Sequence, residues 1–104
     1  MSNDCIFCKI VAGEIPSERV YEDDLVLAFR DISPAAPTHV LLIPKEHVPT
    51  ADDLTEAHAD VLTALTRAAQ TVARQEGIEG AYRLVVNCGK AAGQAVFHLH
   101  VHLI

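Results

Sequence analysis

The chain has 104 residues, 50% of them hydrophobic, which is long enough for one compact domain and too short for two. Its 14 acidic and 8 basic residues give a net charge of -6, which disfavours non-specific binding to nucleic acid or anionic membranes. The sequence contains neither a signal-peptide pattern nor an apolar run near the roughly 18 residues of a membrane span. We therefore expect one cytoplasmic domain over residues 1–104, with no nucleic-acid or membrane partner.

The first predicted element is a short helix over about residues 5–12, with Asp4 as its cap and Gly13 at its left-handed end. Two strands follow, near residues 19–22 and 25–30, joined by an acidic turn. The first third of the chain thus predicts a helix followed by a β-hairpin.

A third strand is predicted over residues 39–44, where a continuous apolar run indicates burial on both faces. Apolar residues at helical spacing from residue 55 to about 76 predict one long helix. A fourth strand (81–88) and a fifth (96–104) flank a loop bounded by glycines. The fold class is therefore α+β: a five-stranded antiparallel sheet with one long helix and a short N-terminal helix.

Three histidines alternate with apolar residues in the last segment, FHLHVHLI. Because side chains at i, i+2 and i+4 of a strand share a face, His98, His100 and His102 would line one face. The other face, against the long helix, would carry Phe97, Leu99, Val101 and Leu103. The histidine face could be an incidental polar surface, a metal site, or a catalytic site in which neutral imidazole attacks phosphorus.

Cys5 and Cys8 have C-x-x-C spacing in the first predicted helix, whose N-terminal dipole favours thiolates. The pair could bind zinc with two further ligands, remain as unligated thiols, or form a redox pair. Cys88 is most simply a small buried residue.

The triad and four longer segments resemble the histidine-triad (HIT) superfamily of nucleotide hydrolases and transferases, in its bacterial nucleotide-binding (Hint-like) branch with C-x-x-C. The segments are CIFCKIVAGEIPSERVYEDD, LAFRDISPAAPTHVLLIPKEH, YRLVVNCG and GQAVFHLHVH. This resemblance implies a hydrolase of purine nucleoside 5'-phosphoramidates or related conjugates, working through a covalent nucleotidyl-histidine and needing no metal. The alternatives are a dinucleoside polyphosphate hydrolase and a nucleotide-binding regulator with vestigial catalysis.

The resemblance also implies residue roles. His100 would be the nucleophile, His102 would contact the phosphate, and His39 would help to orient the attacking imidazole. Asp31 would accept hydrogen bonds from the ribose hydroxyls, although on its own it also fits a turn-capping aspartate. Residues near the phosphate or leaving group would be Asn87, Gly93, Gln94 and Ala95.

An apolar slot for an AMP-like or GMP-like base is implied by the same resemblance, although each of its members taken alone fits an ordinary core. These residues are Ile6, Phe7, Ile10, Phe29, Ile32 and Leu41. For zinc, the resemblance adds His47 and the first triad histidine, His98, to Cys5 and Cys8. The zinc site would be closed and structural, and would withdraw His98 from direct chemistry.

Two departures from the family pattern stand out. Ala95 occupies a position where relatives often carry a hydroxyl, so we expect slower turnover on poor leaving groups. Related chains continue past the triad, whereas this sequence stops at Ile104, so we expect the C-terminal tail to be absent. Members of this branch are usually homodimers whose sheets join, and we expect the same here.

Overall fold

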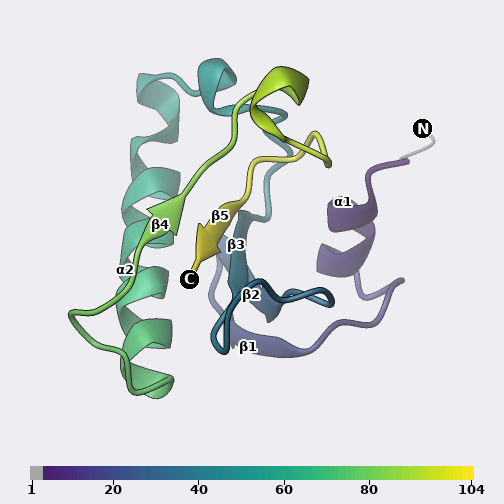
Figure 1. Cartoon of the computed structure of the whole chain (residues 1–104). Helices are drawn as coiled ribbons and strands as arrows, with labels where there is room; N and C mark the ends of the chain where they lie inside the picture. Colours follow the sequence, from purple (N-terminus) through teal and green to yellow (C-terminus); the bar gives the residue numbers. More distant parts are fainter. Residues whose placement is uncertain (1–3) are drawn as a thin grey trace.

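A five-stranded antiparallel sheet with the order β1-β2-β3-β5-β4 forms the centre of the computed structural model, which describes residues 4–104 (Figure 1). The strands are β1 (Arg19–Glu22), β2 (Val26–Arg30), β3 (Val40–Pro44), β4 (Leu84–Val85) and β5 (Val101–Leu103). β3 pairs with both β2 and β5, which leaves β1 and β4 as the two edges. The predicted α+β fold class is therefore confirmed.

Two α-helices lie on opposite sides of this sheet (Figure 1). The short helix is α1 (Ile6–Val11) and the long helix is α2 (Ala59–Gln75). Three short 3-10 helices lie in the connections: η1 (Ala51–Asp53), η2 (Glu56–His58) and η3 (Lys90–Ala92). The sheet is thus covered on both faces, as the apolar run of β3 predicts.

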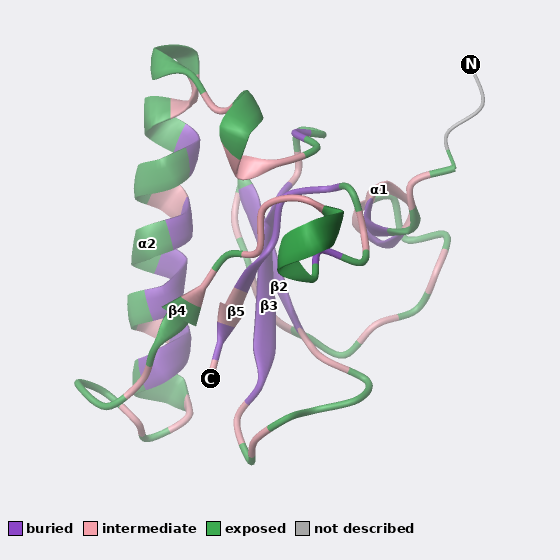
Figure 2. Cartoon of the chain, turned by 45° about the horizontal axis from the view of Figure 1, so that its top comes forward, coloured by how far each residue is buried: buried purple, intermediate pink, exposed green. Residues whose placement is uncertain are grey.

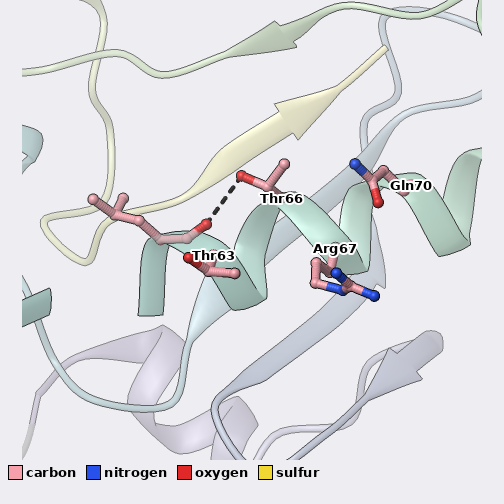
Figure 3. Close-up of a pocket in the computed structure, with 5 residues that line it drawn as sticks. Thr63, Thr66, Arg67 and Gln70 are labelled. Carbon is pink, nitrogen blue, oxygen red and sulfur yellow. Dashed lines mark hydrogen bonds between the residues drawn. The ribbon is translucent and has the colours of Figure 1, made fainter. Parts of the chain in front are cut away.

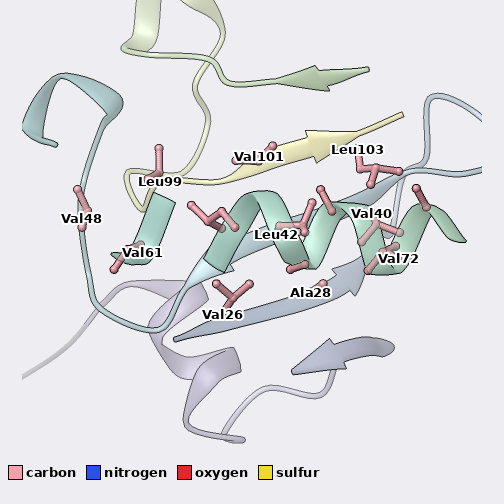
Figure 4. Packing of buried hydrophobic residues seen from close by; sticks show 14 residues of the cluster. Val26, Ala28, Val40, Leu42, Val48, Val61, Val72, Leu99, Val101 and Leu103 are labelled. Atoms are coloured by element: carbon pink, nitrogen blue, oxygen red, sulfur yellow. The ribbon is translucent and has the colours of Figure 1, made fainter. Parts of the chain in front are cut away.

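The two faces of the sheet bury separate hydrophobic clusters, because alternate strand residues point to opposite sides. The cluster under α2 includes Val26, Ala28, Val40, Leu42, Leu99, Val101 and Leu103 (Figure 4). The cluster under α1 consists of Phe7, Ile10, Leu27, Phe29, Leu41 and Ile43. Each fully buried leucine or isoleucine of β2 and β3 contributes roughly 2 kcal/mol relative to an exposed one.

The long helix is amphipathic, with its buried stripe turned toward the sheet and its other face exposed (Figure 2). The predicted apolar positions are all buried: Val61, Leu65, Ala68, Ala69 and Val72. The α-helix begins at Ala59, later than predicted, because Thr55 first caps η2. The hydroxyl of Thr55 accepts a hydrogen bond from the Ala57 amide at 3.2 Å, and the Thr55 amide donates to His58 Nδ1 at 2.9 Å.

Three predicted features near the ends of the chain are wrong. The cap of α1 is Cys5, whose sulfur accepts a hydrogen bond from the Cys8 amide at 3.3 Å, so Asp4 is not the cap. The last strand is shorter than predicted, because the Leu99 amide bonds to the carbonyl of Val48, in a loop, at 2.6 Å. Phe97, predicted to pack against α2, is 47% exposed and lies in neither cluster.

A bidentate ion pair joins the end of β2 to the end of α2. Arg30 donates from both terminal nitrogens to the carboxylate of Glu76, at 2.8 Å each. The hydrogen bond from Arg30 lowers the pKa of Glu76, and the opposite charge lowers it further, against the effect of burial. Since Asp31 follows Arg30, this pair also anchors the start of the 31–39 loop.

We expect Glu76→Gln to lower the free energy of unfolding at pH 7 by about 1 kcal/mol, because the charged hydrogen bonds are lost. The folded-state pKa of Glu76 lies below its ordinary value, so the contribution is present above that value and is lost as the pH falls through the lowered pKa. Urea unfolding at several pH values measures this. Glu79→Gln, at an exposed pair with Arg74, is the control. An equal loss in both variants would contradict the assignment.

Candidate active site

The histidine triad turns toward the α1 side of the sheet. The His100 ring lies edge-on to Phe7 at a centroid distance of 5.2 Å, and the His98 ring contacts Phe7 at 5.9 Å. The His102 ring lies 5.0 Å from that of His100. The residues that follow each histidine, Leu99, Val101 and Leu103, belong to the cluster under α2. The predicted two-faced arrangement therefore holds for every position except Phe97, although of the three histidines only His102 lies within β5.

The His98 carbonyl fixes the tautomer of His100. The Nδ1 atom of His100 lies 2.8 Å from the carbonyl oxygen of His98. Because a carbonyl can only accept, Nδ1 must carry the proton, and Nε2 of the neutral ring keeps its lone pair. His100 is 7% exposed, so the ring is held by its surroundings. This arrangement gives Nε2 the lone pair that the predicted nucleophile requires.

A second chain of hydrogen bonds fixes the tautomer of His102. The Ala35 amide donates to His39 Nδ1 at 3.0 Å, so the His39 proton lies on Nε2. His39 Nε2 then donates to His102 Nδ1 at 2.9 Å, which places the His102 proton on its own Nε2. That Nε2 is buried and has no hydrogen-bond partner among residues 4–104. His102 thus offers an N–H donor to an incoming oxygen, and His39 acts on His102 rather than bonding to His100.

Burial lowers the pKa of His102 below the ordinary histidine value. Repulsion from His100 and His39 lowers this pKa further, and the carboxylate of Asp31 partly opposes the shift. Burial is also the main cause of the lowered pKa of His98. The lowered pKa values favour neutral rings at pH 7, as the tautomer assigned to His102 requires.

Asp31 is the first residue of the 31–39 loop, and its carboxylate makes two contacts. Its Oδ1 accepts from the Ser33 amide at 2.7 Å, so it does cap a turn. Its Oδ2 lies 3.6 Å from His39 Nε2, on the side of the triad. The carboxylate can fill the turn-capping role and still present an oxygen near His102, and its contact with a ribose stays a prediction.

Asp31, His39 and His102 place three potential metal ligands within 4.8 Å of one another. A metal on His39 Nε2 would need the ring proton on Nδ1, which already accepts from the Ala35 amide. The hydrogen bonds therefore favour proton positioning here over metal binding.

The six residues of the predicted base slot do not all come together. Four of them, Phe7, Ile10, Phe29 and Leu41, are buried in the cluster under α1. Ile6 is 45% exposed and Ile32 is 99% exposed. The buried four also fit the ordinary core interpretation, so a base slot here stays a prediction.

Gln94 holds the glycine-bounded loop together. Its side-chain oxygen accepts from the Gly89 amide at 2.8 Å, and its nitrogen donates to the carbonyls of Pro49 at 2.8 Å and Val96 at 3.0 Å. The side chain is thus committed to the backbone, a role that the sequence did not predict. Its contact with a phosphate stays a prediction.

Three other residues predicted near the phosphate or leaving group are Asn87, Gly93 and Ala95. Gly93 has a φ of +94°, which favours glycine, and a Cβ there would lie 3.9 Å from Asn87 Nδ2. Asn87 and Gly93 are therefore close, as a shared phosphate site requires. Ala95 is exposed, and its methyl group supplies no hydroxyl at this point of the surface.

The four predicted zinc ligands converge at the N-terminal end of α1. Potential ligand atoms of Cys5, Cys8, His47 and His98 all lie within 4.8 Å of one another. His98 Nδ1 is 3.3 Å from the sulfur of Cys5 and 3.5 Å from that of Cys8. His47 Nδ1 is 3.3 Å from the sulfur of Cys8.

These separations fit a zinc site. Zinc bonds of about 2.3 Å to sulfur and 2.0 Å to nitrogen at a tetrahedral centre place the two ligand atoms about 3.5 Å apart. The Nε2 atom of His98 donates to the Pro44 carbonyl at 2.8 Å, which leaves Nδ1 with its lone pair toward the sulfurs. The residues present therefore fit the ion that the resemblance implies. Pro44 orients His98 through its backbone carbonyl, and a pattern of side chains in the sequence cannot indicate such a contact.

Within residues 4–104, no helix combines the length and apolar character needed to cross a membrane.

Named proteins are similar in sequence to this chain over nearly its whole length. A purine nucleoside phosphoramidase of Escherichia coli strain K12 is 50% identical over 105 residues, an alignment that covers 100% of this chain and 88% of that protein. A 14 kDa zinc-binding protein of Brassica juncea is 51% identical, with 97% and 91% covered. The chain therefore resembles both a named phosphoramidase and a named zinc-binding protein.

Solved structures agree. A HIT family hydrolase of Clostridium thermocellum superimposes with a TM-score of 0.95 at 50% identity, covering 100% of this chain and 91% of that one. A HIT family hydrolase of Legionella pneumophila gives 0.94 at 46% identity, covering 97% and 91%. The HIT domain family model matches residues 12–104. The resemblance predicted from the triad is thus confirmed, and the chain belongs to the HIT domain family.

Proposed function

We propose that the protein is a single-domain cytoplasmic hydrolase that cleaves purine nucleoside 5'-phosphoramidates or related nucleotide conjugates. The observation that carries this proposal is the bond from His100 Nδ1 to the His98 carbonyl, which leaves the lone pair of the neutral ring on Nε2. The phosphoramidase relative at 50% identity and the HIT family hydrolases of known structure support the same reaction class.

In this reaction, His100 Nε2 attacks the α-phosphorus and forms a P–N bond. The bond between phosphorus and the leaving amine breaks, and the amine takes up a proton as it departs. Water then attacks the phosphorus, the bond to His100 breaks, and the nucleoside monophosphate is released with one proton lost to solvent. No metal takes part in either step.

The Nε2–H of His102 suits the charge that develops on the phosphoryl oxygens. It is a buried donor without a partner among residues 4–104, and its direction of donation is fixed through His39. Such a preoriented donor stabilises the transition state without having to reorganise. Asp31 would bind the ribose hydroxyls, and the amides near Gly93 would approach the phosphate.

A regulator that binds nucleotides but hardly turns them over is the second candidate, and the exposed Ala95 favours it because no hydroxyl assists the leaving group there. A dinucleoside polyphosphate hydrolase is the third. Turnover of adenosine 5'-phosphoramidate separates the first proposal from the regulator. Preference for that substrate over diadenosine tetraphosphate separates it from the third.

We expect rapid mixing with adenosine 5'-phosphoramidate, quenching without acid and intact mass measurement to reveal a transient adenylyl adduct. His100→Ala should abolish the adduct and reduce turnover by at least about a thousandfold, because the attacking atom is removed. His58→Ala, at a histidine outside both histidine clusters, is the control and should keep the adduct. An adduct that persists in His100→Ala would contradict the assignment of the nucleophile.

We also propose a structural zinc ion held by Cys5, Cys8, His47 and His98. The convergence of their ligand atoms and the orientation of His98 by the Pro44 carbonyl support it, as does the zinc-binding relative at 51% identity. When bound, the ion would tie α1 and the 45–49 loop to the segment before β5.

Protein purified without chelator should contain about one equivalent of zinc, and Cys8→Ala should contain less than about a tenth. Chelation should lower the midpoint of thermal unfolding by several degrees, because binding to the folded state alone stabilises it. Cys88→Ala is the matched control, since Cys88 lies outside the cluster. Metal analysis and a thermal melt measure both effects, and absence of zinc from the parent protein would refute this site.

We further propose a homodimer in which the α2 and β4 surface meets a second copy. β4 is an edge strand, and Leu62, Leu84 and Val86 around it are 41 to 43% exposed. A hollow of about 200 Å³ lies between α2 and β4, lined by these three residues with Leu65, Thr66 and Val101. A twofold contact would cover this apolar surface and the unpaired edge together.

The outer face of α2 continues this surface with polar groups. Thr63, Thr66, Arg67 and Gln70 line a second hollow of about 370 Å³ (Figure 3). The hydroxyl of Thr66 is bonded to the Leu62 carbonyl within the helix, at 3.0 Å. A partner helix would therefore meet an apolar centre at Leu62 and a polar rim along α2.

Leu84→Glu should convert the dimer into a monomer at micromolar concentration, because a charge would be buried without a partner at the twofold contact. Light scattering with size-exclusion chromatography measures this. Leu25→Glu is the matched control, because Leu25 is equally exposed, at 40%, but lies in the turn between β1 and β2. A parent protein that is already monomeric would overturn the dimer.

A further inference from the structure

His98 takes part in three interactions at once, and together they join the cysteine cluster to the nucleophile. Its Nδ1 faces the sulfurs of Cys5 and Cys8, its Nε2 donates to Pro44, and its carbonyl accepts from His100. Its side chain is fully buried. A shift of this residue would therefore move the atom that fixes the tautomer of His100.

The peptide unit between His98 and Leu99 is held from both sides. A trans peptide directs its carbonyl and its N–H in opposite directions. The carbonyl of His98 accepts from His100 at 2.8 Å, and the N–H of Leu99 donates to the Val48 carbonyl at 2.6 Å. The orientation of this one peptide plane therefore sets the direction of the His100 hydrogen bond.

Both partners of the Leu99–Val48 bond are next to residues of the cysteine cluster. Val48 follows His47, and Leu99 follows His98. The two imidazole rings meet edge-to-face with their centroids 5.0 Å apart. Residues 45–49 and 96–100 both lie outside the strands, so no sheet ladder holds them in place. Ligation of His47 and His98 by one ion would fix the relative position of these two segments.

Without an ion, weak S–H···N hydrogen bonds can link the two cysteines to the two imidazoles. His98 and His47 each direct an Nδ1 toward the sulfurs, and two thiols or thiolates face them. Each thiol proton can satisfy one imidazole lone pair, but an S–H group is a weak donor, and such bonds hold the side chains less firmly than coordination of one ion. A divalent cation would accept all four ligands together.

We propose that this four-residue cluster positions the nucleophile: occupation by a divalent ion fixes the His98–Leu99 peptide and so holds the proton of His100 on Nδ1. Cys5, Cys8 and His47 are then positioning residues for His100, and the site does more than fasten α1. This inference rests on the proposed role of His100 as the attacking group.

The test reads the His100 ring directly, by long-range proton–nitrogen correlation spectra of protein labelled with ¹⁵N-histidine. Zinc-loaded parent protein should show His100 as the Nδ1–H tautomer with a slowly exchanging proton. Removal of zinc by a chelator should accelerate that exchange about tenfold, as expected for the loss of roughly one hydrogen bond's contribution. Addition of zinc should reverse the change.

Two variants separate ligation from general loosening of the loop. His47→Ala in excess zinc should behave like the chelated parent. His58→Ala removes a contact to Glu46 on the same loop but no ligand, and should behave like the loaded parent. If His47→Ala fails to fold, the parent with and without chelator makes the same comparison with no substitution.

The proposal is overturned if zinc binds and its removal leaves the His100 tautomer and proton exchange unchanged. It is equally overturned if His98 and His47 show no response to zinc, or if His58→Ala loosens His100 as much as His47→Ala. Adduct formation is measured on the same samples. An adenylyl adduct with a metal-insensitive His100 refutes the positioning role alone, whereas a metal-sensitive His100 with no adduct refutes the proposed function alone.

Discussion

The chemistry of this site depends on one hydrogen bond, from Nδ1 of His100 to the carbonyl oxygen of His98. A neutral imidazole has one nitrogen with a proton and one with a lone pair, and only the second can attack an electrophile. Without a fixed acceptor at Nδ1, the two tautomers would interchange. A backbone carbonyl two residues earlier makes the choice permanent, provided that the backbone itself is held.

The hydrophobic core holds that backbone. Leu99, Val101 and Leu103 are buried under α2, and they alternate with the three histidines on the other face. Burial of these apolar side chains therefore supplies the free energy that keeps the histidines on the opposite face in place. The segment before β5 lies outside the sheet. Its Leu99 amide is therefore available to bond to Val48, and the His98 carbonyl faces His100. A longer regular strand would have committed both groups to its neighbours.

Much of this fold follows from the sequence because its signals are local and periodic. The apolar run at Val40–Pro44 and the helical spacing from Val61 to Val72 predict the central strand and α2 correctly. The late start of the last strand was not predictable, because it depends on a contact between Leu99 and Val48, which are far apart in the chain. Phe97 continues the apolar alternation in the sequence, yet it lies beyond the point where the strand pattern applies.

The site was predictable where side chains carry the chemistry and was not where the backbone does. Histidines and cysteines can be recognised by type and spacing, and the family resemblance supplied their partners. The groups that give them direction are the Ala35 amide and the carbonyls of Pro44 and His98, which any residue would provide. Gln94 is an intermediate case, because its amide could equally bind a ligand or the loop, and only the fold shows that it bonds to Gly89, Pro49 and Val96.

Two pairs of histidines shape the site, and in each pair one ring or carbonyl fixes where the other ring carries its proton. His39 transmits a constraint from the 31–39 loop to His102, and His98 transmits one from the cysteine cluster to His100. Each path ends at an Nε2 atom: on His102 a buried N–H without a hydrogen-bond partner among residues 4–104, and on His100 the nitrogen that keeps the lone pair. In the proposed reaction the first is a donor and the second a nucleophile, and a phosphoryl group suits both, with oxygens to accept the hydrogen bond and phosphorus to accept the lone pair.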